Sequence, residues 1–277
     1  MHGLGNDFIV FEADDRRLGA LPHQQWRELA DRRRGIGFDQ ALVIEPPRSA
    51  GTEAYYRIFN ADGSEVEQCG NGARCVAELL RLRHRTANGR VALESAGGLV
   101  AAELKSPGIV AVDMGEPDFS PEAVAFDTQG QPGPQYQLVI GDRHTGFSIV
   151  SMGNPHAVID VDDVATAPVG TLGAALESHP RFRHRVNVGF RRIVSRGHIQ
   201  LRVFERGVGE TLACGTGACA AVATGRRAGL LDERVQVDLP GGCLTLSWAG
   251  PGRHLWMQGP AEVSFTGYIN LQEFPDP

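Results

Sequence analysis

Two cysteine-containing turns of one design are the residues of this chain best suited to carry chemistry. Residues 59–77 read FNADGSEVEQCGNGARCVA, and residues 204–222 read FERGVGETLACGTGACAAV. An ungapped offset of about 145 residues (214 minus 69) places Cys69 on Cys214 and keeps the surrounding Cys-Gly-x-Gly-Ala pattern. Small and apolar residues at helical spacing follow each turn. The sequence therefore predicts two thiols, each at the N-terminus of a helix.

A helix N-terminus gives a thiol a particular environment. The first N–H groups have no intrahelical acceptor, and the helix dipole adds partial positive charge, so anions bind there. Cysteines in such positions have pKa values lowered to about 3.5–7.5 in known cases. The glycines of each turn carry no Cβ and allow the backbone to approach a ligand closely. Each turn is therefore a candidate site for a carboxylate beside a thiolate.

Two such helix ends facing one cleft predict inversion at an amino-acid α-carbon. One thiolate would take the α-proton, and the opposite thiol would return a proton to the other face. The helix ends would stabilise the charge that develops on the carboxylate. Pyridoxal phosphate needs a lysine, and Lys105, the only lysine, lies in the predicted turn ELKSPG. The chemistry is therefore expected to use no cofactor.

Other interpretations of these residues remain open. Buried cysteines are usually small apolar core residues, which is the role expected for Cys75, Cys219 and Cys243. Simple anion binding at the two turns, without catalysis, is the main rival to the two-base chemistry. A lone histidine such as His156 is more often structural than catalytic. Zinc is not expected, because the usual ligand spacing is missing from the candidate set Cys69, Cys214, His156 and Glu205.

Composition limits the class of protein. The chain has 277 residues, enough for two domains, and 42% hydrophobic with 22% charged residues is ordinary for a globular protein. A formal net charge of -6 argues against nucleic acid or an anionic membrane as partner. No apolar run approaches the roughly 20 residues of a membrane span, and no export signal is recognisable, so a cytoplasmic location is expected. An odd count of five cysteines without a CxxC pair argues against a disulfide framework.

The segments that must position the two turns alternate between strand and helix patterns. Residues 5–15 are predicted as a strand, and residues 22–34 as a helix with Trp26, Leu29 and Ala30 on one face. Residues 35–47 follow as turn and strand. VALESAGGLVAAEL (91–104) predicts two strands joined through a pair of glycines.

The second half of the chain retraces the first. SMGNPHAVIDV (151–161) resembles HGLGNDFIVFE (2–12), and VQVDLPGGCLTLSW (235–248) matches VALESAGGLVAAEL with the glycine pairs aligned. RVNVGF loosely echoes RGIGFD. These matches predict a duplicated α/β fold of the α+β type, with two pseudo-symmetric domains. Each is expected to be a mostly antiparallel sheet wrapped around a central helix.

The expected domain boundaries follow from composition. Residues 1–117 form the first domain and residues 118–261 the second, beginning with a connector over 118–137 that is rich in Pro, Gly and Gln. The last stretch, about 262–277, is predicted as one more strand that returns to the first domain.

At these residues the chain resembles the diaminopimelate epimerase family, whose members interconvert L,L- and meso-2,6-diaminopimelate for lysine and peptidoglycan synthesis. The resemblance covers almost the whole chain, apart from residues 127–135. It rests on eight stretches that occur in order, namely MHGLGNDF, GIGFDQ, RIFNADGSE, CGNGARC, MGNPH, RVNVGF, ERGVGET and ACGTGACA.

The resemblance implies a cofactor-free two-base mechanism in which Cys69 and Cys214 are the acid and base. It places His156 and Glu205 beside the thiols, and it implies two domains that close on the substrate and a homodimer. The backbone at Gly70-Asn71 and Gly215-Thr216 would hold the reacting carboxylate, and Arg206 with asparagines would grip the far end of the substrate. The full set of implied substrate-binding residues is Asn6, Gln40, Asn60, Gly70, Asn71, Asn154, Asn187, Glu205, Arg206, Gly215 and Thr216.

Two rival functions remain at this point. One is another two-cysteine racemase or epimerase, acting on proline or hydroxyproline, although the Glu205-Arg206 pair suits a substrate with a distal ammonium and carboxylate better. The other is a non-catalytic protein that binds an anionic metabolite at the two helix ends.

Overall fold

The computed structural model describes residues 1–12, 21–67, 69–86 and 89–269. The chain divides into two compact units, which are described separately. Unit 1 comprises residues 1–112 and 259–277, and unit 2 comprises residues 113–258. The domain boundaries expected after residues 117 and 261 remain a prediction, because a compact unit need not fold by itself.

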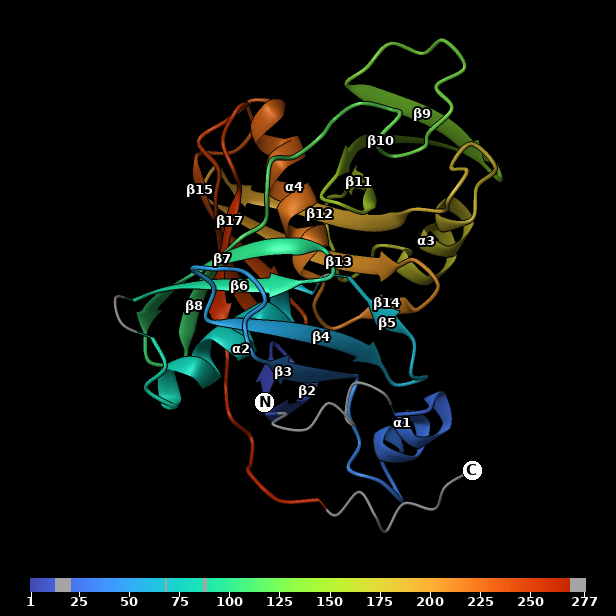
Figure 1. The fold of residues 1–277 in the computed structure, drawn as a ribbon. Helices are drawn as coiled ribbons and strands as arrows, with labels where there is room; N and C mark the ends of the chain where they lie inside the picture. Colours follow the sequence, from blue (N-terminus) through green and yellow to red (C-terminus); the bar gives the residue numbers. More distant parts are fainter. Residues whose placement is uncertain (13–20, 68, 87–88, 270–277) are drawn as a thin grey trace. The chain divides into compact units, whose positions relative to one another are not determined.

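Unit 1 is a curved sheet with a long helix, α2, among its strands (Figure 1). Its helices are α1 (His23–Ala30) and α2 (Gly70–Leu82). Its strands are β1 (His2–Gly3), β2 (Asn6–Glu12), β3 (Gln40–Glu45), β4 (Ala54–Asn60), β5 (Glu65–Val66), β6 (Arg90–Ser95), β7 (Gly98–Ser106) and β8 (Ile109–Asp113).

Helix α2 forms where the sequence predicts it, and its pattern explains its central place. Ala73, Val76, Ala77 and Leu80 are at most 1% exposed and recur at the spacing of one helix face. This face packs against β1, β2, β3, β6 and β7. Cys69 is the N-cap, and its sulfur accepts a hydrogen bond from the backbone N–H of Gly72 at 3.4 Å. The thiol of Cys69 therefore lies at the N-terminus of α2.

The register of the strands brings several predicted site residues to one edge of unit 1. Strands β2 and β3 are parallel, with Phe8 opposite Gln40. Strands β3 and β4 are antiparallel, with Gln40 opposite Asn60. The starts of β2 and β3 therefore lie beside the end of β4.

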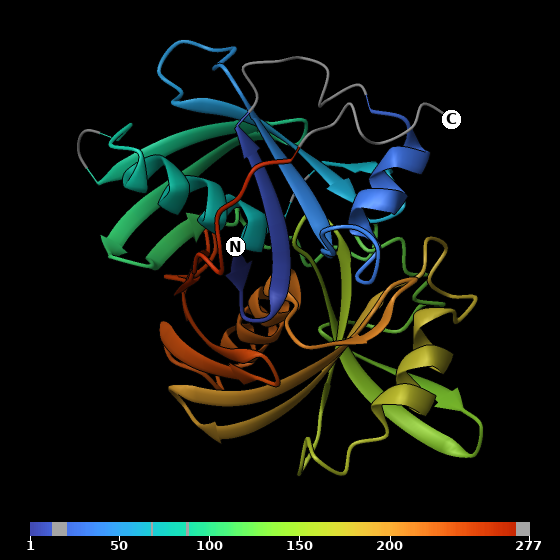
Figure 2. The same cartoon turned by 90° about the horizontal axis from the view of Figure 1, so that it is seen from below.

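Unit 2 has the same plan with an added hairpin. Its helices are α3 (Val169–Glu177) and α4 (Gly215–Arg227). Its strands are β9 (Gln135–Ile140), β10 (Arg143–Ser151), β11 (Pro155–Asp160), β12 (Asn187–Ser195), β13 (His198–Glu205), β14 (Gly209–Thr211), β15 (Arg234–Leu239), β16 (Gly242–Ser247) and β17 (Trp256–Pro260), the last of which runs into unit 1. Helix α4 packs against β10, β11, β12, β13 and β16, and strands surround it in Figure 2.

Apart from the β9–β10 pairing, which has no counterpart in the described part of unit 1, the strand pairings of the two units correspond. Strands β11 and β12 are parallel, as β2 and β3 are, and β13 is parallel to β15, as β4 is to β6. The two glycine-paired hairpins also match, since Ser95 pairs with Gly98 and Leu239 with Gly242. Gly98 and Gly242 have φ angles of 109° and 139°, which side chains other than glycine rarely adopt. The predicted pseudo-symmetric α+β fold is confirmed.

One detail of the predicted repeat is wrong. The match of RVNVGF to RGIGFD places Asn187 on Ile36, whereas the pairings place it on Gln40, because His156 faces Asn187 as Phe8 faces Gln40. The two loops that enter these strands differ in length. A match without gaps therefore could not find the register.

The predicted connector is in part a core segment of unit 2. Residues 118–134 are largely irregular, but Val124 and Phe126 are only 0% and 5% exposed. The Phe126 ring packs on Phe182 with 4.6 Å between centroids and edge-on to Phe147 at 5.5 Å. The Pro and Gly content of this segment predicted its irregular backbone correctly. Burial of the Val124 and Phe126 side chains determines the path of this backbone along the core of unit 2. The hairpin β9–β10 and helix α3 were not predicted.

Two predicted elements are shorter than expected. The helix predicted over 22–34 ends at Ala30, where Asp31 accepts backbone hydrogen bonds from Arg33 and Arg34 and so turns the chain. The last stretch does return to unit 1, where Glu262 forms an isolated bridge with His2. Residues 264–269 are not in a strand, and residues 270–277 lie outside the described part of the chain, as do residues 13–15 of the first predicted strand.

Candidate active site

The site residues predicted for unit 1 surround the mouth of α2. The side chain of Asn71, in the first turn of the helix, donates from Nδ2 to Asn6 Oδ1 at 3.1 Å. Its own Oδ1 accepts from Arg74 at 2.9 Å. Arg74 is fully buried and also donates to the carbonyl of Pro260 at 3.2 Å. These bonds tie the start of β2 to the helix end that carries Cys69.

A second pair of amides lies on the adjoining strands. Gln40 donates to Asn60 Oδ1 at 2.9 Å, and Asn60 donates to the hydroxyl of Ser64 at 3.0 Å. Both are half-buried, and neither carries charge. Four predicted site residues of unit 1 therefore form two hydrogen-bonded amide pairs, Asn6 with Asn71 and Gln40 with Asn60.

Tyr56 is a neighbour of Cys69 that the sequence did not suggest. Its side chain is 1% exposed, and burial, followed by the adjacent Cys69, raises the pKa of its phenol, although a hydrogen bond with Ser95 opposes the shift. A neutral phenol therefore lies close to the thiol. No motif marks it, since a tyrosine within a strand normally indicates core packing.

In unit 2, Cys214 occupies the position that Cys69 has in unit 1. It is the N-cap of α4, and its sulfur accepts from the backbone N–H of Gly217 at 3.4 Å and lies 3.6 Å from the hydroxyl of Thr216. Burial and then the charge of Glu205 raise the pKa of this thiol well above its usual value, and the bonds from Thr216 and Gly217 offset only part of that. The lowered pKa expected at a helix end is wrong for Cys214. Its environment favours the protonated thiol.

A chain of hydrogen bonds leads from Thr216 to His156. Asn154 donates from Nδ2 to the Thr216 hydroxyl at 3.2 Å, and Asn154 Oδ1 lies 2.9 Å from His156 Nε2. His156 is 1% exposed, and its Nδ1 has no hydrogen-bond partner among the residues that the structure describes. Burial, followed by the nearby charge of Arg206, lowers the pKa of this imidazole to about 3. His156 is therefore neutral at ordinary pH. Asn154 and Thr216 connect it by hydrogen bonds to the thiol of Cys214.

Asn187 and Arg206 complete the unit 2 site. The Oδ1 of Asn187 accepts from the backbone N–H of Arg206 at 2.9 Å, and its Nδ2 donates to the carbonyl of Pro155 at 2.9 Å. The exposed guanidinium of Arg206 donates to the carbonyl of His184 at 3.1 Å. Glu205 accepts a short hydrogen bond from the hydroxyl of Thr211, a residue that the sequence did not indicate.

The two sets occupy corresponding places in their units. Each lies where two parallel strands begin, one antiparallel strand ends, and a cysteine-capped helix begins. Unit 1 brings together Cys69, Asn6, Gln40, Asn60, Gly70 and Asn71. Unit 2 brings together Cys214, Asn154, His156, Asn187, Glu205, Arg206, Gly215 and Thr216.

A comparison with protein families adds to this geometry. The model of the family described as diaminopimelate epimerase matches residues 1–120 and 148–264. The chain belongs to the diaminopimelate epimerase family. The unmatched interval contains residues 127–135, which the sequence resemblance also left out, together with most of the added hairpin β9–β10. This family membership supports an isomerase of the racemase and epimerase class with a small-molecule substrate.

Solved structures share the fold of this diaminopimelate epimerase family member at low sequence identity. A probable proline racemase from Agrobacterium radiobacter K84, with bound carbonate, is 18% identical with a TM-score of 0.66, covering 91% of this chain and 82% of that one. A hydroxyproline epimerase from Agrobacterium vitis, with bound trans-4-hydroxy-L-proline, is 19% identical with a TM-score of 0.66, covering 94% and 87%. A phenazine biosynthesis protein of the PhzF family from Enterococcus faecalis is 15% identical with a TM-score of 0.64, covering 96% and 94%. At such identities the likeness concerns the fold.

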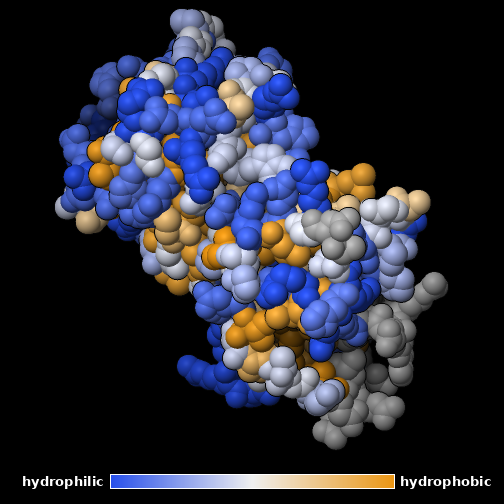
Figure 3. All heavy atoms as spheres, turned by 90° about the vertical axis from the view of Figure 1, so that its left-hand side faces the viewer, coloured by the Kyte–Doolittle hydropathy of each residue, from blue (hydrophilic) through white to orange (hydrophobic). Residues whose placement is uncertain are grey.

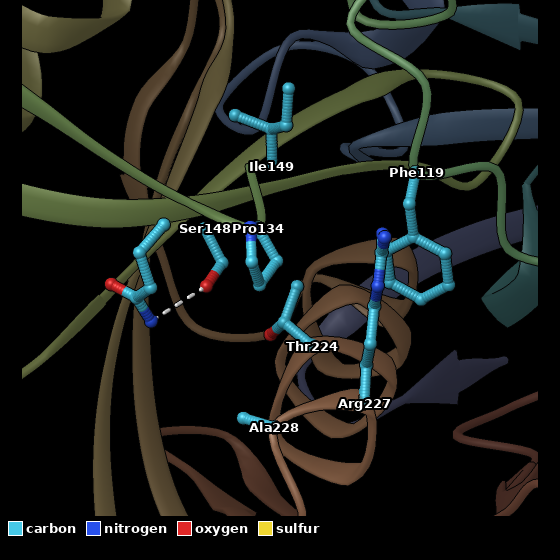
Figure 4. Close-up of a pocket in the computed structure, with 8 residues that line it drawn as sticks. Phe119, Pro134, Ser148, Ile149, Thr224, Arg227 and Ala228 are labelled. Atoms are coloured by element: carbon cyan, nitrogen blue, oxygen red, sulfur yellow. Dashed lines mark hydrogen bonds between the residues drawn. The ribbon is translucent and has the colours of Figure 1, made fainter. Parts of the chain in front are cut away.

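Two hollows of unit 2 lie elsewhere, at the C-terminal end of α4. The smaller, of about 40 Å³, is drawn in Figure 4, where Arg227 lies along the ring of Phe119. Gln135, which also lines it, donates from Nε2 to the hydroxyl of Ser148 at 3.2 Å. The guanidinium carbon of Arg227 is 4.4 Å from the Phe119 centroid. The larger, of about 900 Å³, shares these two residues and adds Arg196, Arg226 and Trp248. Neither is lined by a predicted site residue.

Two further findings concern the described residues. No three His, Cys, Asp or Glu side chains in that part of this family member come together as metal ligands. None of its helices there combines the length and apolar character needed to cross a membrane.

Proposed function

We propose that this chain interconverts L,L- and meso-2,6-diaminopimelate by a two-base mechanism without a cofactor. The observation that carries the proposal is the repeated site, in which each unit caps a central helix with a cysteine and surrounds the helix mouth with amide side chains. The family match supports the reaction class. The substrate and the roles of individual residues are part of the proposal.

In the proposed reaction the two cysteines exchange roles with the direction of turnover. With Cys214 protonated, as its raised pKa favours, Cys69 takes the α-proton of the bound amino acid. The electron pair of the broken C–H bond moves into the carboxylate, which the N–H groups at Gly70-Asn71 and Gly215-Thr216 stabilise. Cys214 then donates its proton to the opposite face of the carbon. The enzyme ends with the proton on Cys69 and is ready for the reverse reaction.

Arg206 and three asparagines are proposed to hold the far end of the substrate. A guanidinium binds a carboxylate through two parallel hydrogen bonds, and the guanidinium of Arg206 is exposed to solvent. Asn60, Asn154 and Asn187 would add direction without charge. These contacts would recognise the L-configured α-carbon at the far end of the substrate, which does not react. The α-carbon at the other end would remain free to invert. His156 and Glu205 are proposed to tune and orient the thiols, and the Glu205 effect on Cys214 supports this.

Proton exchange in heavy water tests the proposal. With no added cofactor, the protein should introduce deuterium at the α-carbon of L,L-diaminopimelate, as followed by proton NMR. Cys69→Ala and Cys214→Ala should each abolish epimerisation. Absence of exchange with the wild-type protein, or appreciable turnover by either variant, would refute the two-base proposal.

Proline and hydroxyproline form the second candidate substrate class. The proline racemase and hydroxyproline epimerase with this fold favour it, whereas the exposed charge of Arg206 suits a longer substrate. The same exchange experiment with L-proline and trans-4-hydroxy-L-proline separates the two. Exchange with these but not with diaminopimelate would reassign the substrate. Exchange with none would favour a binding protein.

We also propose a homodimer. Figure 3 shows hydrophobic residues between hydrophilic ones on one face of the molecule. In the C-terminal stretch of unit 1, Phe265 is 68% exposed and Tyr268 is fully exposed, as is unusual for aromatic side chains. Light scattering after size exclusion should give twice the mass of the chain. Phe265→Ser with Tyr268→Ser should shift it to the monomer.

A further inference from the structure

Glu177 is a buried carboxylate that the proposed mechanism does not use. It is 6% exposed and is the last residue of α3. A negative charge is unfavourable at a helix C-terminus, where the dipole already places partial negative charge. Burying a carboxylate adds a desolvation cost that must be offset by contacts. Glu177 at this position therefore does not stabilise α3. Its role is to be found in the contacts that its side chain makes.

The contacts of Glu177 connect the two segments that carry Asn187 and Arg206, two of the proposed distal-binding residues. Its Oε1 accepts from the backbone N–H of Gly207 at 3.0 Å, immediately after Arg206. The same oxygen accepts from the guanidinium of Arg185 at 3.2 Å, two residues before Asn187. Its backbone carbonyl accepts from the N–H of Val186 at 3.1 Å. One residue thus ties the loop entering β12 to the turn leaving β13.

These are the same two segments that Arg206 itself joins. Its backbone N–H bonds to the Asn187 side chain at 2.9 Å, and its guanidinium bonds to the carbonyl of His184 at 3.1 Å. The loop is not relaxed, because Arg185 has a φ angle of 58°, which is uncommon for a residue other than glycine. A neighbouring contact must hold such a conformation. The structure provides the ion pair with Glu177 at 3.2 Å and a backbone hydrogen bond from the N–H of Arg185 to the carbonyl of Phe182 at 3.1 Å.

We propose that Glu177 is a positioning residue that fixes the turn at Arg206, and so sets where the guanidinium meets the distal carboxylate of the substrate. The inference about the substrate rests on the proposed function, whereas the inference about the turn does not. In this proposal Glu177 acts through the turn and not by contact with the substrate. Its loss should therefore weaken binding of the distal group and leave the proton transfers at the cysteines intact.

The first test measures the turn and needs no activity. Hydrogen exchange followed by mass spectrometry should show the backbone amide of Gly207 exchanging at least about tenfold faster in Glu177→Ala, because its acceptor is gone. Asp160→Ala is the matched control. It breaks the 2.7 Å ion pair of the buried Arg191 elsewhere in unit 2 and should destabilise the unit without changing Gly207. Unchanged exchange at Gly207 in Glu177→Ala would overturn the positioning role.

The second test separates binding from chemistry. With diaminopimelate, Glu177→Ala should raise KM about tenfold and change kcat less than about threefold, while Asp160→Ala should leave KM unchanged. In an Arg206→Ala background, adding Glu177→Ala should have less than about a twofold further effect. An unchanged KM, or an undiminished effect in that background, would overturn the link to Arg206.

If Glu177→Ala does not fold, Glu177→Gln should show the same trends more weakly, because it keeps the acceptor for Gly207 but not the charge for Arg185. No turnover of diaminopimelate by the wild-type protein would instead count against the proposed function, and the Gly207 exchange would still decide the role of Glu177.

Discussion

The two cysteines have the same cap geometry but different electrostatic surroundings. Both sulfurs accept from a glycine N–H at 3.4 Å. Beside Cys214, however, stands the carboxylate of Glu205, and the thiol is only 4% exposed. Burial and a like charge both disfavour a thiolate, and here they outweigh the helix end. The position of a cysteine at a helix mouth therefore does not by itself determine its protonation.

Removal of the Glu205 charge should activate Cys214 toward alkylation. Glu205→Gln keeps the shape of the side chain and removes the negative charge that raises the pKa of the thiol. The pKa should fall, the thiolate fraction at pH 7.5 should rise, and iodoacetamide should modify Cys214 several times faster, as read by peptide mass spectrometry. Glu210→Gln, which breaks the nearby ion pair with Arg202, is the control and should leave the rate unchanged. An equal rate in wild type and Glu205→Gln would count against this account.

His156 should make the stability of the protein depend on pH. Its pKa is lowered from 6.5 to about 3 in the folded state, so between these values the unfolded chain binds more protons. Stability is then complete above about pH 6.5 and falls by up to about 1.4 kcal/mol per pH unit as the pH drops toward 3. His156→Gln should flatten this slope between pH 6.5 and 5, measured by urea unfolding. Parallel slopes for the two proteins would show that His156 is not buried and neutral.

At the scale of elements, Gly72 and Gly217 allow each cysteine-capped helix to lie close to its sheet. A Cβ built on Gly217 would lie 3.0 Å from Val203 Cγ2 and 3.2 Å from Cys214 Sγ, and one built on Gly72 would lie 3.0 Å from Leu42 Cδ2. These are tighter than ordinary contacts. Backbone approach to a ligand is thus one reason for the glycines, and packing of the helix on β13 or β3 is another.

Gly217→Ala should displace the thiol of Cys214. The new methyl must push Val203, whose branched side chain is stiff, or the sulfur, so kcat should fall at least about tenfold. Gly170→Ala in α3 is the control, since, apart from its chain neighbours and the backbone of its own helix, no heavy atom of the described residues lies within 4 Å of its Cβ position. It should stabilise the protein by up to about 1 kcal/mol and keep full activity. Steady-state kinetics and thermal unfolding check both, and an unimpaired Gly217→Ala would contradict the packing account.

The elements differ in how far the sequence could predict them. Helices α2 and α4 were predictable because small residues, glycines and apolar spacing all point to the same structure. Helix α3 was missed because Gly170 and Gly173 weaken the helical pattern, although Gly173 is needed where a Cβ would lie 2.7 Å from Phe204. Contacts between distant segments, such as Glu177 with Gly207, have no local signal. Repetition within the sequence indicated the two cysteine turns, and the family resemblance implied the other site residues. Neither indicated the residues that support them.

At the scale of the whole molecule, the two units place their site residues at corresponding positions but differ in the charge of one of them. Ala41 faces Phe59 as Val188 faces Phe204, so Asn60 and Glu205, each one residue further, correspond. A neutral amide in unit 1 thus stands where unit 2 has a carboxylate. This substitution explains why the Cys214 thiol is next to a negative charge. In the proposed mechanism, this difference favours the protonated form of Cys214 and so its role as the acid in the first direction of turnover.

Oxidation tests whether the two units bring their cysteines to one carbon. The proposed mechanism requires the sulfurs of Cys69 and Cys214 to flank a single stereocentre, so a mild oxidant should join them and abolish activity, and a reductant should restore it. Peptide mapping of the inactive protein should find this pair. Cys243, the exposed cysteine, supplies the control, since Cys243→Ser should not prevent the inactivation. Inactive oxidised protein without a Cys69–Cys214 bond would mean that the two helix mouths do not act on one substrate.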